Sequence, residues 1–479
     1  MKVLYINPPY GDDFVRSARW AAKSRGRVQR HPEQALIHIA VLENAGHECK
    51  FADAAAMNMK EEEVKKIITD FKPDITIVHT TTPSIYNDIG YAKLAKEISN
   101  CKTVLVGAHA SAEPKDTLLK SNGNVDFVVI GEPDYTLRDI CANMDRESIL
   151  GIAYLKDGEF VENPKRPPLD VNELPFPSWK HIDPKYYHDA GKLYPFLTLY
   201  TGRGCFALCT FCREPAVMDG RRLRIRDAKK VVDEMEYDLS LYPDLREIMF
   251  ETDTFTALPK HVNEVCEEII KRGLHKKIRW SCNVRTDIDT SVLPIMKKAG
   301  CRMLMVGFEF GTNEQLEAVK KGTTIEKARD FVKKAKKLGF TIHGCFMIGA
   351  PNETPKSAQA TIDFAKSLPL DTIQVSGIAV YPGTELYRWA KENNYIRAKD
   401  WTDWVDENKE QVTLLSYPQM SKEEIDYYID KGLKEFYMRP SQMFRMFFNI
   451  RSFDDVIRKF YGLKSFLDYF SKNKRETVK

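Results

Sequence analysis

The sequence contains no uninterrupted apolar run long enough to span a lipid bilayer, which argues against a membrane-spanning helix. It also shows no secretory signal layout, because the first six residues read as a strand that leads directly into Pro8 and Pro9. The 10 cysteines among 479 residues follow no short-range pairing pattern, so a disulfide framework is not expected. Together these features predict a protein of the reducing cytoplasm.

Neither acidic nor basic residues are in large excess, since the formal net charge is +4. Basic residues nevertheless gather at one end of the chain. Residues 431–479 contain 12 Lys and Arg against 5 Asp and Glu. The remainder of the chain is therefore slightly acidic, and basicity is a property of the carboxyl-terminal tail.

Three cysteines stand close together in the pattern Cys205-x3-Cys209-x2-Cys212, just after two glycines that permit tight turns. Three thiols within eight residues can face one point only if the chain wraps around it. Thiolates bind zinc or iron–sulfur clusters. No fourth zinc ligand follows at short range, because the next cysteine is Cys266 and no histidine lies between Cys212 and His261. Three thiolates would instead hold a [4Fe–4S] cluster and leave one iron open to a substrate or cosubstrate.

This spacing, with the aromatic residue Phe211 before the last cysteine, resembles that of the radical S-adenosylmethionine (SAM) superfamily. The resemblance implies that the open iron chelates the amino and carboxyl groups of SAM. It further implies that an electron from the cluster cleaves SAM to a 5′-deoxyadenosyl radical. An electron donor such as a flavodoxin or a ferredoxin is then an expected partner. Phe211 would present backbone groups and an aromatic face to adenine.

Residues 196–400 repeat a strand-then-helix pattern, which predicts a partial (β/α)6 barrel with its site at the carboxyl ends of the strands. Polar residues gather at those ends. A carboxylate of Glu251 or Asp253 can accept a charge-assisted bond from the SAM ammonium group. Arg285 can pair with the SAM carboxylate, and Glu309 can bind a ribose or a guanidinium. By resemblance, the SAM-binding strand ends also include Thr252, Asn283, Gly349 and Tyr381. The expected strands are 196–200, 247–250, 278–284, 302–308, 341–347 and 372–380.

Residues 1–145 alternate short apolar runs with helical patterns, which predicts a Rossmann-like parallel α/β sheet. Ligands of such sheets bind at the carboxyl ends of the strands. The loops there resemble those of the cobalamin-binding-type domain that precedes many radical SAM barrels, so cobalamin is the third expected cofactor. The expected strands are 3–6, 49–52, 75–78, 104–106 and 127–130, and the loop residues concerned are Pro8, Thr81, Gly107, His109, Gly131 and Glu132.

The Asp-x-His-x-x-Gly motif that would supply a histidine to cobalt is absent. Relatives without it either hold cobalamin with no protein histidine or keep the fold without the cofactor, and both alternatives remain open. His109 is accordingly either a cofactor-loop residue or a histidine that caps backbone groups.

Two further segments carry distinctive compositions. Residues 146–195 are punctuated by prolines and predict a linker. Residues 16–30 contain six basic residues and no acid, which favours either a solvated loop or a lid that gathers an anionic group.

The cysteines of the barrel region outside the triplet are scattered, so we expect them in the core. A role near the substrate is the alternative for two of them that lie on expected barrel strands. The four residues are Cys266, Cys282, Cys301 and Cys345, and the two in question are Cys282 and Cys345.

Residues 401–479 predict a helical, basic region. Ser421 and Glu424 form a capping box before a helix expected to end near Arg439. Apolar stripes at helical spacing follow within 443–448, 453–461 and 463–470, with basic residues between them. These stripes either dock onto the barrel or bind an anionic membrane surface. The stretch 438–441 resembles relatives that act on polyisoprenoid or hopanoid lipids.

The sequence therefore predicts a radical SAM enzyme that functionalises an unactivated carbon of a lipid or isoprenoid-like substrate. The reaction would be methylation through cobalamin, or carbon–carbon bond formation or rearrangement. The expected partners are a small-molecule or lipid substrate and the inner face of a membrane, with no nucleic acid.

An RNA methylthiotransferase is the second hypothesis, because such enzymes place three cysteines in their first domain and Cys49, Cys101 and Cys141 fit superficially. The third hypothesis is a non-catalytic cobalamin or metal sensor, in which the polar strand ends would have no role.

Overall fold

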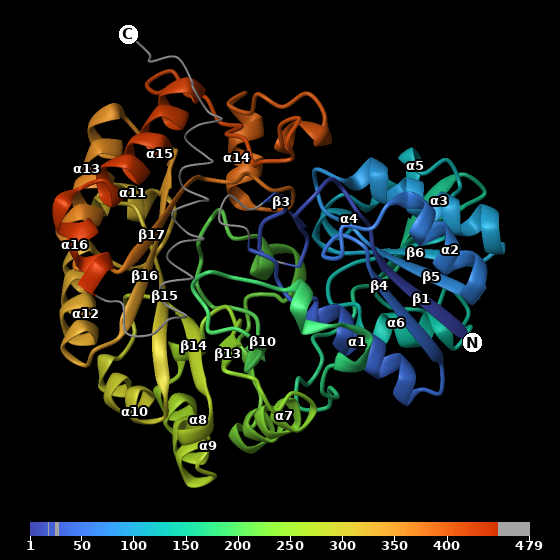
Figure 1. Cartoon of the computed structure of the whole chain (residues 1–479). Helices are drawn as coiled ribbons and strands as arrows, with labels where there is room; N and C mark the ends of the chain where they lie inside the picture. Colours follow the sequence, from blue (N-terminus) through green and yellow to red (C-terminus); the bar gives the residue numbers. More distant parts are fainter. Residues whose placement is uncertain (18, 24–27, 449–479) are drawn as a thin grey trace.

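The computed structural model describes residues 1–17, 19–23 and 28–448, and shows two sheet domains side by side (Figure 1). The first sheet has the strand order β4-β1-β5-β6-β7-β8-β9, and the second has the order β10-β13-β14-β15-β16-β17. This confirms the predicted α/β fold, with a Rossmann-like domain followed by a partial barrel.

The first five strands of the amino-terminal sheet are parallel and buried on both faces, which explains their nearly continuous apolar sequences. Val3 and Tyr5 pack with α1 and α6, whereas Leu4 and Ile6 pack with α2 and α3 on the opposite face. The strands are β1 (Lys2–Asn7), β4 (Glu48–Asp53), β5 (Ile75–His79), β6 (Lys102–Val106) and β7 (Phe127–Val129). The helices are α1 (Glu33–Asn44), α2 (Glu61–Phe71), α3 (Ile85–Ser99), α4 (Ala108–Ala112), α5 (Pro114–Lys120) and α6 (Asp134–Cys141).

A β-hairpin lies in the segment that the prolines led us to expect as a linker. Strands β8 (Ile152–Lys156) and β9 (Glu159–Glu162) pair antiparallel and extend the amino-terminal sheet. Asp157 and Gly158 connect them with φ angles of 53° and 85°. This Asp-Gly pair suits the tight turn that favours hairpins, and this local signal outweighs the surrounding prolines.

The second sheet is parallel throughout, and its strands follow one another in chain order. Residues alternate on β16: Ile342 and Phe346 are buried with the core, whereas His343, Cys345 and Met347 are half-buried on the other face, toward the barrel interior. Because β10 and β17 are the end strands, the barrel stays open between them. The strands are β10 (Phe196–Leu199), β13 (Glu247–Phe250), β14 (Arg279–Val284), β15 (Cys301–Glu309), β16 (Thr341–Ile348) and β17 (Thr372–Gly377).

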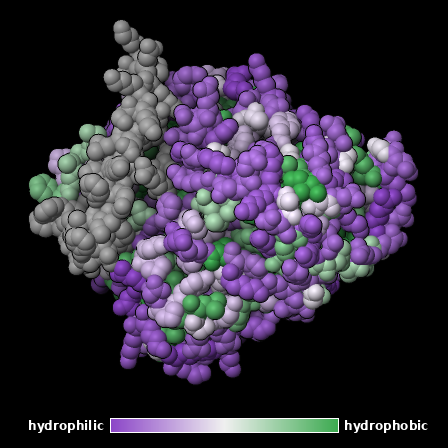
Figure 2. Space-filling view, turned by 45° about the vertical axis from the view of Figure 1, so that its right-hand side comes forward, coloured by the Kyte–Doolittle hydropathy of each residue, from purple (hydrophilic) through white to green (hydrophobic). Residues whose placement is uncertain are grey.

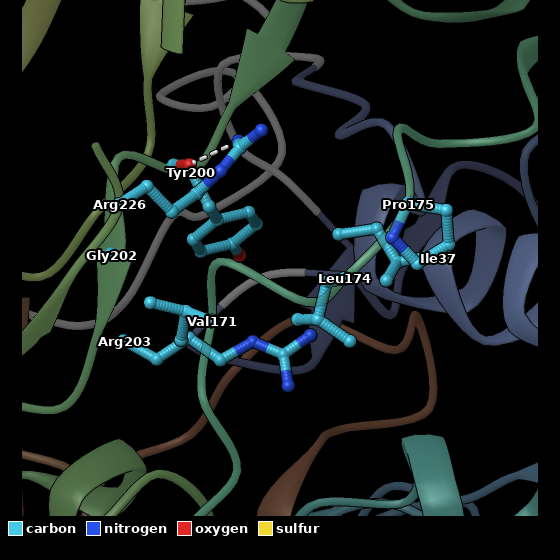
Figure 3. Close-up of a pocket in the computed structure, with 8 residues that line it drawn as sticks. All are labelled: Ile37, Val171, Leu174, Pro175, Tyr200, Gly202, Arg203 and Arg226. Carbon is cyan, nitrogen blue, oxygen red and sulfur yellow. Dashed lines mark hydrogen bonds between the residues drawn. The ribbon is translucent and has the colours of Figure 1, made fainter. Parts of the chain in front are cut away.

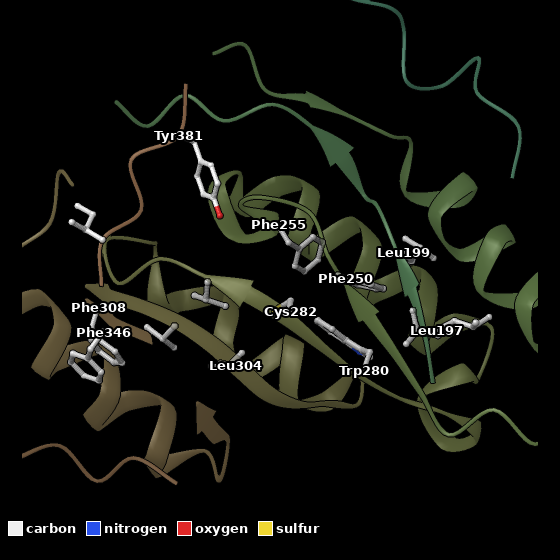
Figure 4. Packing of buried hydrophobic residues seen from close by; sticks show 14 of the residues in the cluster. Leu197, Leu199, Phe250, Phe255, Trp280, Cys282, Leu304, Phe308, Phe346 and Tyr381 are labelled. Atoms are coloured by element: carbon white, nitrogen blue, oxygen red, sulfur yellow. The ribbon is translucent and has the colours of Figure 1, made fainter. Parts of the chain in front are cut away.

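The outer helices of the barrel cover an aromatic core in which Phe250 stacks on Trp280, with ring centroids 4.8 Å apart (Figure 4). Cys282 is fully buried in this core, as expected, while Cys345 lies on the face toward the barrel interior. The outer helices are α7 (Ala228–Leu241), α8 (Pro259–Lys271), α9 (Leu274–Lys277), α10 (Leu293–Lys298), α11 (Asn313–Ala318), α12 (Ile325–Lys337) and α13 (Pro355–Ser367), and α14 (Glu385–Glu392) follows the last strand.

One apolar core is shared by both domains, because Leu36 of α1 and Leu197 of β10 belong to the same buried cluster. Trp179 lies fully buried in it and donates a hydrogen bond of 2.8 Å from Nε1 to Asp238 on α7. The outer surface is largely hydrophilic on the face shown in Figure 2. Within the described residues, none of the helices combines the length and apolar character that crossing a bilayer requires.

The carboxyl-terminal region is less helical than expected at its start, since residues 405–420 contain only isolated bridges. The capping box of Ser421 and Glu424 is confirmed, and opens α15 (Lys422–Tyr437). Helix α16 (Pro440–Phe448) carries the first apolar stripe, with Met443 and Phe444 exposed. The stripes expected within 453–470 lie outside the described residues.

Candidate functional site

The three clustered cysteines lie in a loop that leaves the end of β10. The chain turns through β11 (Gly202–Arg203), which pairs antiparallel with β12 (Arg224–Ile225). A side chain at Gly202 would clash with the carbonyl oxygen of Arg224, and one at Gly204 with that of Arg222. Gly204 also has a φ of +84°, which favours glycine. The two glycines therefore let the loop close tightly around the thiols.

The thiols of this loop share a site from which water is largely excluded. Cys205 and Cys209 are buried and pack with Cys212 and Phe211. Burial raises the pKa of the Cys205 thiol, and burial together with nearby Asp253 raises that of Cys212. Such thiols ionise readily only when a metal takes up their negative charge.

The donor set at this loop fits an iron–sulfur cluster better than a single metal ion. Among the described residues, no three His, Cys, Asp or Glu side chains are arranged to hold one ion. The ligands of a cluster bind different irons and need not converge on one point. The three cysteines therefore fit the cluster that the sequence predicts.

Two cations lie against the cysteine loop. Arg285 is buried and places Nη1 3.7 Å from the sulfur of Cys209, while Asp287 holds the other side of its guanidinium at 2.9 and 2.8 Å. Lys321 is also buried and pairs with Glu309 at 2.6 Å. Burial alone would lower the pKa of Lys321. Glu309 and Cys209 raise the pKa by more than burial lowers it, so the ammonium stays charged. Arg285 thus keeps one nitrogen directed at the loop, whereas Glu309 is engaged by Lys321.

Some of the polar side chains predicted to bind SAM near the end of β13 form hydrogen bonds that hold the loop together. The Thr252 hydroxyl accepts a 2.7 Å bond from the Thr201 amide, which ties the ends of β13 and β10 together. Asn283 donates to the carbonyl oxygens of Glu251 and Thr252 at 3.4 Å. The side chains of Thr252 and Asn283 therefore hold the loop in this structure, and their expected contact with SAM stays a prediction.

One carboxylate oxygen each of Glu251 and Asp253 is buried without a hydrogen-bond partner among the described residues. Burial raises the pKa of Asp253, and the partner Arg19, 3.0 Å away, opposes that rise. Buried unpaired carboxylate oxygens are rare in folded proteins and fit a bound cation. The ammonium group of SAM satisfies this requirement.

The basic segment that includes Arg19 forms ion pairs inside the protein. Arg16 is buried and binds Asp88 at 2.8 Å. Arg19 donates to the carbonyl oxygen of Glu251 at 3.2 Å, as well as to Asp253. For Arg16 and Arg19, these contacts correct the interpretation of the segment as a solvated loop, because the partners of both lie far away in the sequence.

The last two predicted strand-end residues are engaged by the protein itself. The Gly349 amide donates to Glu353 at 3.0 Å, and its carbonyl accepts from the Tyr417 hydroxyl at 2.9 Å. The Tyr381 hydroxyl accepts from the Ala21 amide at 3.3 Å. Gly349 and Tyr381 therefore take part in hydrogen bonds within the protein at the barrel mouth, and their expected contact with SAM stays a prediction.

The loops at the carboxyl edge of the amino-terminal sheet abut the cysteine loop. Helix α4 packs against the helical turn Glu214–Met218, which follows the last cysteine of the triplet. Glu132 bonds Arg224 at 2.8 Å through both of its oxygens, and Asp134 pairs with Arg203 at 2.6 Å. Glu132, predicted to bind cobalamin, thus fastens the two domains together.

The remaining predicted cobalamin residues line the same edge. The Thr81 hydroxyl is 2.6 Å from that of Ser84, and a side chain at Gly107 would clash with the Thr80 carbonyl. Gly131 donates to the Ser111 hydroxyl at 2.6 Å. Pro8 follows the end of β1 at this edge.

His109 is the residue of this edge that best fits a ligand. It is buried, and its Nδ1 lies 3.3 Å from the Thr82 hydroxyl, while Nε2 has no hydrogen-bond partner in the part of the chain that the structure describes. Burial lowers the pKa of His109 to about 4, so the imidazole is neutral near pH 7. An unpaired nitrogen in the predicted cofactor loop is the observation that fits cobalamin at this edge.

A small cavity marks the junction behind the cysteine loop (Figure 3). Its volume is about 10 Å³, enough for about one water molecule. Arg226 donates to the Tyr200 carbonyl at 2.8 Å on one side, while Leu174, Pro175 and Ile37 close the other. This cavity is far too small for a cofactor, so it belongs to the packing between domains.

Sequence reasoning missed several residues of this site. Arg19 lies in a stretch with basic residues and no acid, which indicated a possible anion site. The sequence did not indicate that its partner is Asp253. Lys321 and Asp287 follow no pattern that separates them from surface residues, and only the fold brings them to Cys209 and Arg285.

Comparisons with known proteins agree with this division of the chain. A family model described as the radical SAM superfamily matches residues 199–365, and one described as a B12 binding domain matches residues 29–141. An uncharacterized methyltransferase of Pyrococcus horikoshii is 30% identical over 460 residues, which cover 95% of this chain and 96% of the relative.

Two further proteins are similar to this chain over most of its length. The anaerobic magnesium-protoporphyrin IX monomethyl ester cyclase of Rubrivivax gelatinosus is 29% identical over 403 residues, covering 81% of this chain and 70% of the relative. The solved structure of the radical SAM methyltransferase TsrM from Kitasatospora setae, with cobalamin and a [4Fe–4S] cluster bound, is 16% identical with a TM-score of 0.70. It covers 98% of this chain and 99% of that chain, and at this identity the likeness shows the fold.

Proposed function

This chain belongs to the radical SAM enzymes that carry an amino-terminal B12-binding domain, and we propose that it methylates an unactivated carbon of a small organic substrate. One observation carries the proposal: the cysteine loop lies between the unpaired carboxylates at the barrel mouth and the edge of the amino-terminal sheet. The methyltransferase relative supports methylation over the cyclisation named for the Rubrivivax protein.

The residues of this chain have separate tasks in the proposed reaction. When bound, the cluster, SAM and cobalamin supply one electron, a carbon radical and a methyl group. Cys205, Cys209 and Cys212 hold the cluster in a site with little water. Asp253 accepts a hydrogen bond from the SAM ammonium, and Arg285 donates one to the SAM carboxylate through the nitrogen directed at Cys209. The remaining proposed contacts are the backbone and ring of Phe211 with adenine, and His109 with cobalamin.

A lipid or isoprenoid-like substrate is the second candidate, as the tail suggests. Met443 and Phe444 on α16 are 59% and 64% exposed, and Met438 before this helix is 64% exposed. Basic Arg439 and Arg445 flank Met443 and Phe444 in the sequence. Exposed apolar side chains with adjacent cations suit an anionic membrane surface. In this variant of the proposal, the enzyme works at the inner face of a membrane.

The methylthiotransferase hypothesis loses support from the positions of its cysteines. Cys141 packs with the core on one face of the amino-terminal sheet, and Cys101 packs with the core on the other. Cys101 also precedes β6, at the edge opposite the cofactor loops. These thiols cannot meet around one cluster without rearrangement of the sheet.

Anaerobic reconstitution of the full chain with iron and sulfide tests the proposed function. We expect bound iron and sulfide, retention of added cobalamin, and formation of 5′-deoxyadenosine from SAM. The triple substitution of Cys205, Cys209 and Cys212 by Ala should abolish the cluster absorbance and SAM cleavage, while Cys49→Ala serves as a matched control. SAM cleavage by the triple variant would refute the assignment. Purified protein that takes up no cobalt would refute the methylation.

A further inference from the structure

The cysteine loop carries two large apolar side chains on its outer side. Cys205, Ala207 and Cys209 are 8%, 8% and 5% exposed, whereas Phe206 and Leu208 are 52% and 60% exposed. Because burial alternates along the loop, the two apolar residues share the side that faces solvent. They therefore form an apolar surface directly over the buried thiols.

The fold does not require apolar residues at these two positions. The cysteines and Ala207 supply the inward contacts of the loop, and polar side chains at Phe206 and Leu208 would contact water without loss. Single exposed apolar residues are common, but neighbouring ones beside a functional centre mark an interaction site. Large apolar anchors of this kind carry much of the binding energy in protein interfaces.

Positive charge borders the apolar pair. The guanidinium of Arg221 donates a hydrogen bond to the carbonyl of Ala207 and so lies against the loop. Arg222 is exposed. Its backbone carbonyl lies so close to Gly204 that a side chain there would clash with it, so Arg222 also lies beside the cysteine loop. The neighbouring acid Asp219 is buried and adds no negative charge to the surface.

We propose that Phe206, Leu208, Arg221 and Arg222 form the docking surface for an acidic one-electron carrier protein of the flavodoxin type. The proposal rests on the proposed function, because it takes Cys205, Cys209 and Cys212 to hold the cluster. In the step, one electron leaves the reduced carrier and enters the oxidised cluster, while no bond forms or breaks in this chain. Basic residues steer the acidic carrier, and the apolar pair anchors it beside the thiols.

The test uses the anaerobically reconstituted full chain with reduced flavodoxin as the probe. The first variant is Phe206→Ser with Leu208→Ser, and the second is Arg222→Glu. The controls are Leu119→Ser, which removes a side chain 51% exposed on α5, and Lys333→Glu on an exposed position of α12. Flavodoxin binding is measured by titration calorimetry, and SAM cleavage is driven either by flavodoxin or by dithionite.

We expect both variants to weaken flavodoxin binding at least about tenfold, equivalent to ~1.4 kcal/mol. Dithionite-driven cleavage and iron content should stay within about twofold of the wild type, and both controls should bind normally. Added salt should weaken binding of the wild type more than that of Arg222→Glu, because a charge pair is screened. This pattern separates docking from the chemistry of the cluster.

Unchanged flavodoxin binding by both variants would overturn the proposal, as would absence of binding by the wild type. If the Phe206→Ser, Leu208→Ser variant loses iron, the result with Arg222→Glu decides the test, because residue 222 does not lie between the three cysteines in the sequence. A change in liposome sedimentation or oligomeric state, with flavodoxin binding intact, would assign the surface to a membrane or a second copy and overturn the proposal. Loss of methyl transfer with both reductants would count against the proposed function instead.

Discussion

Asp253→Asn should weaken SAM binding strongly while leaving the cluster in place. The substitution keeps the shape of the side chain but removes its charge. One oxygen of Asp253 pairs with Arg19 at 3.0 Å, and the other is buried with no partner within residues 1–17, 19–23 and 28–448. A hydrogen bond to a charged group contributes about 1.5–3 kcal/mol. Its loss corresponds to a SAM Kd that rises about 10- to 150-fold.

The assay is calorimetric titration of SAM into the reconstituted protein, with iron content measured in parallel. Asp244→Asn is the matched control, because this exposed aspartate lies just before the other end of β13. If Asp253→Asn binds SAM within about twofold of the wild type, a difference of only ~0.4 kcal/mol, the carboxylate is not the partner of the ammonium.

The same carboxylate predicts a pH dependence. Burial raises the pKa of Asp253 above its ordinary value, and Arg19 opposes that rise only in part. The group therefore becomes protonated, and loses its attraction for a cation, at a higher pH than an exposed aspartate. SAM affinity of the wild type should fall on acidification in that range, and Asp253→Asn should show a flatter profile. Parallel profiles for the two proteins would contradict the assignment.

Three further changes test the surroundings of the site. Gly204→Ala should reduce the iron retained after reconstitution, because a left-handed φ costs an L residue roughly 1–2 kcal/mol and the new methyl group meets a carbonyl; normal iron content would show that the loop can relax. Arg203→Met should lower the free energy of unfolding in urea by about 3–5 kcal/mol, because it leaves the buried Asp134 with only the neutral His38 beside it, 3.8 Å away, whereas exposed Lys185→Met should change it by less than about 1 kcal/mol. Deletion from Pro440 onward should reduce sedimentation with anionic liposomes and spare SAM cleavage; a truncated protein that unfolds or binds equally well would assign the tail to structural support.

The sequence predicts the two domains well because each rests on a local pattern. Continuous apolar runs mark strands buried on both faces, and the alternation on β16 marks a strand between helices and the barrel interior. The hairpin β8–β9 was missed, although Asp157-Gly158 is a strong local signal, because the prolines around it favoured a linker. The error came from reading composition over a long window when two residues decided the turn.

The site is predicted less completely, because its polar partners come from distant segments. Sequence reasoning placed Thr252 and Asp253 at one strand end, which the structure supports. It could not tell that Thr252 binds the Thr201 backbone, 51 residues away, while Asp253 keeps an unpaired oxygen. Hydrogen-bond partners separated this far leave no spacing in the sequence. The distinction between a ligand-facing and a structural side chain therefore needed the fold.

The apolar core shared by the two sheets limits how relatives of this protein can be recombined. Leu36 of the amino-terminal domain, Trp179 and Leu197 of the barrel belong to one buried cluster, so neither half has a hydrophobic interior separate from that of the other. A chimaera that exchanges only the first domain must also match the packing around Trp179 and the pair of Arg203 with Asp134. Because of that packing, we expect the two domains to be inherited together, whether or not they act in the same reaction.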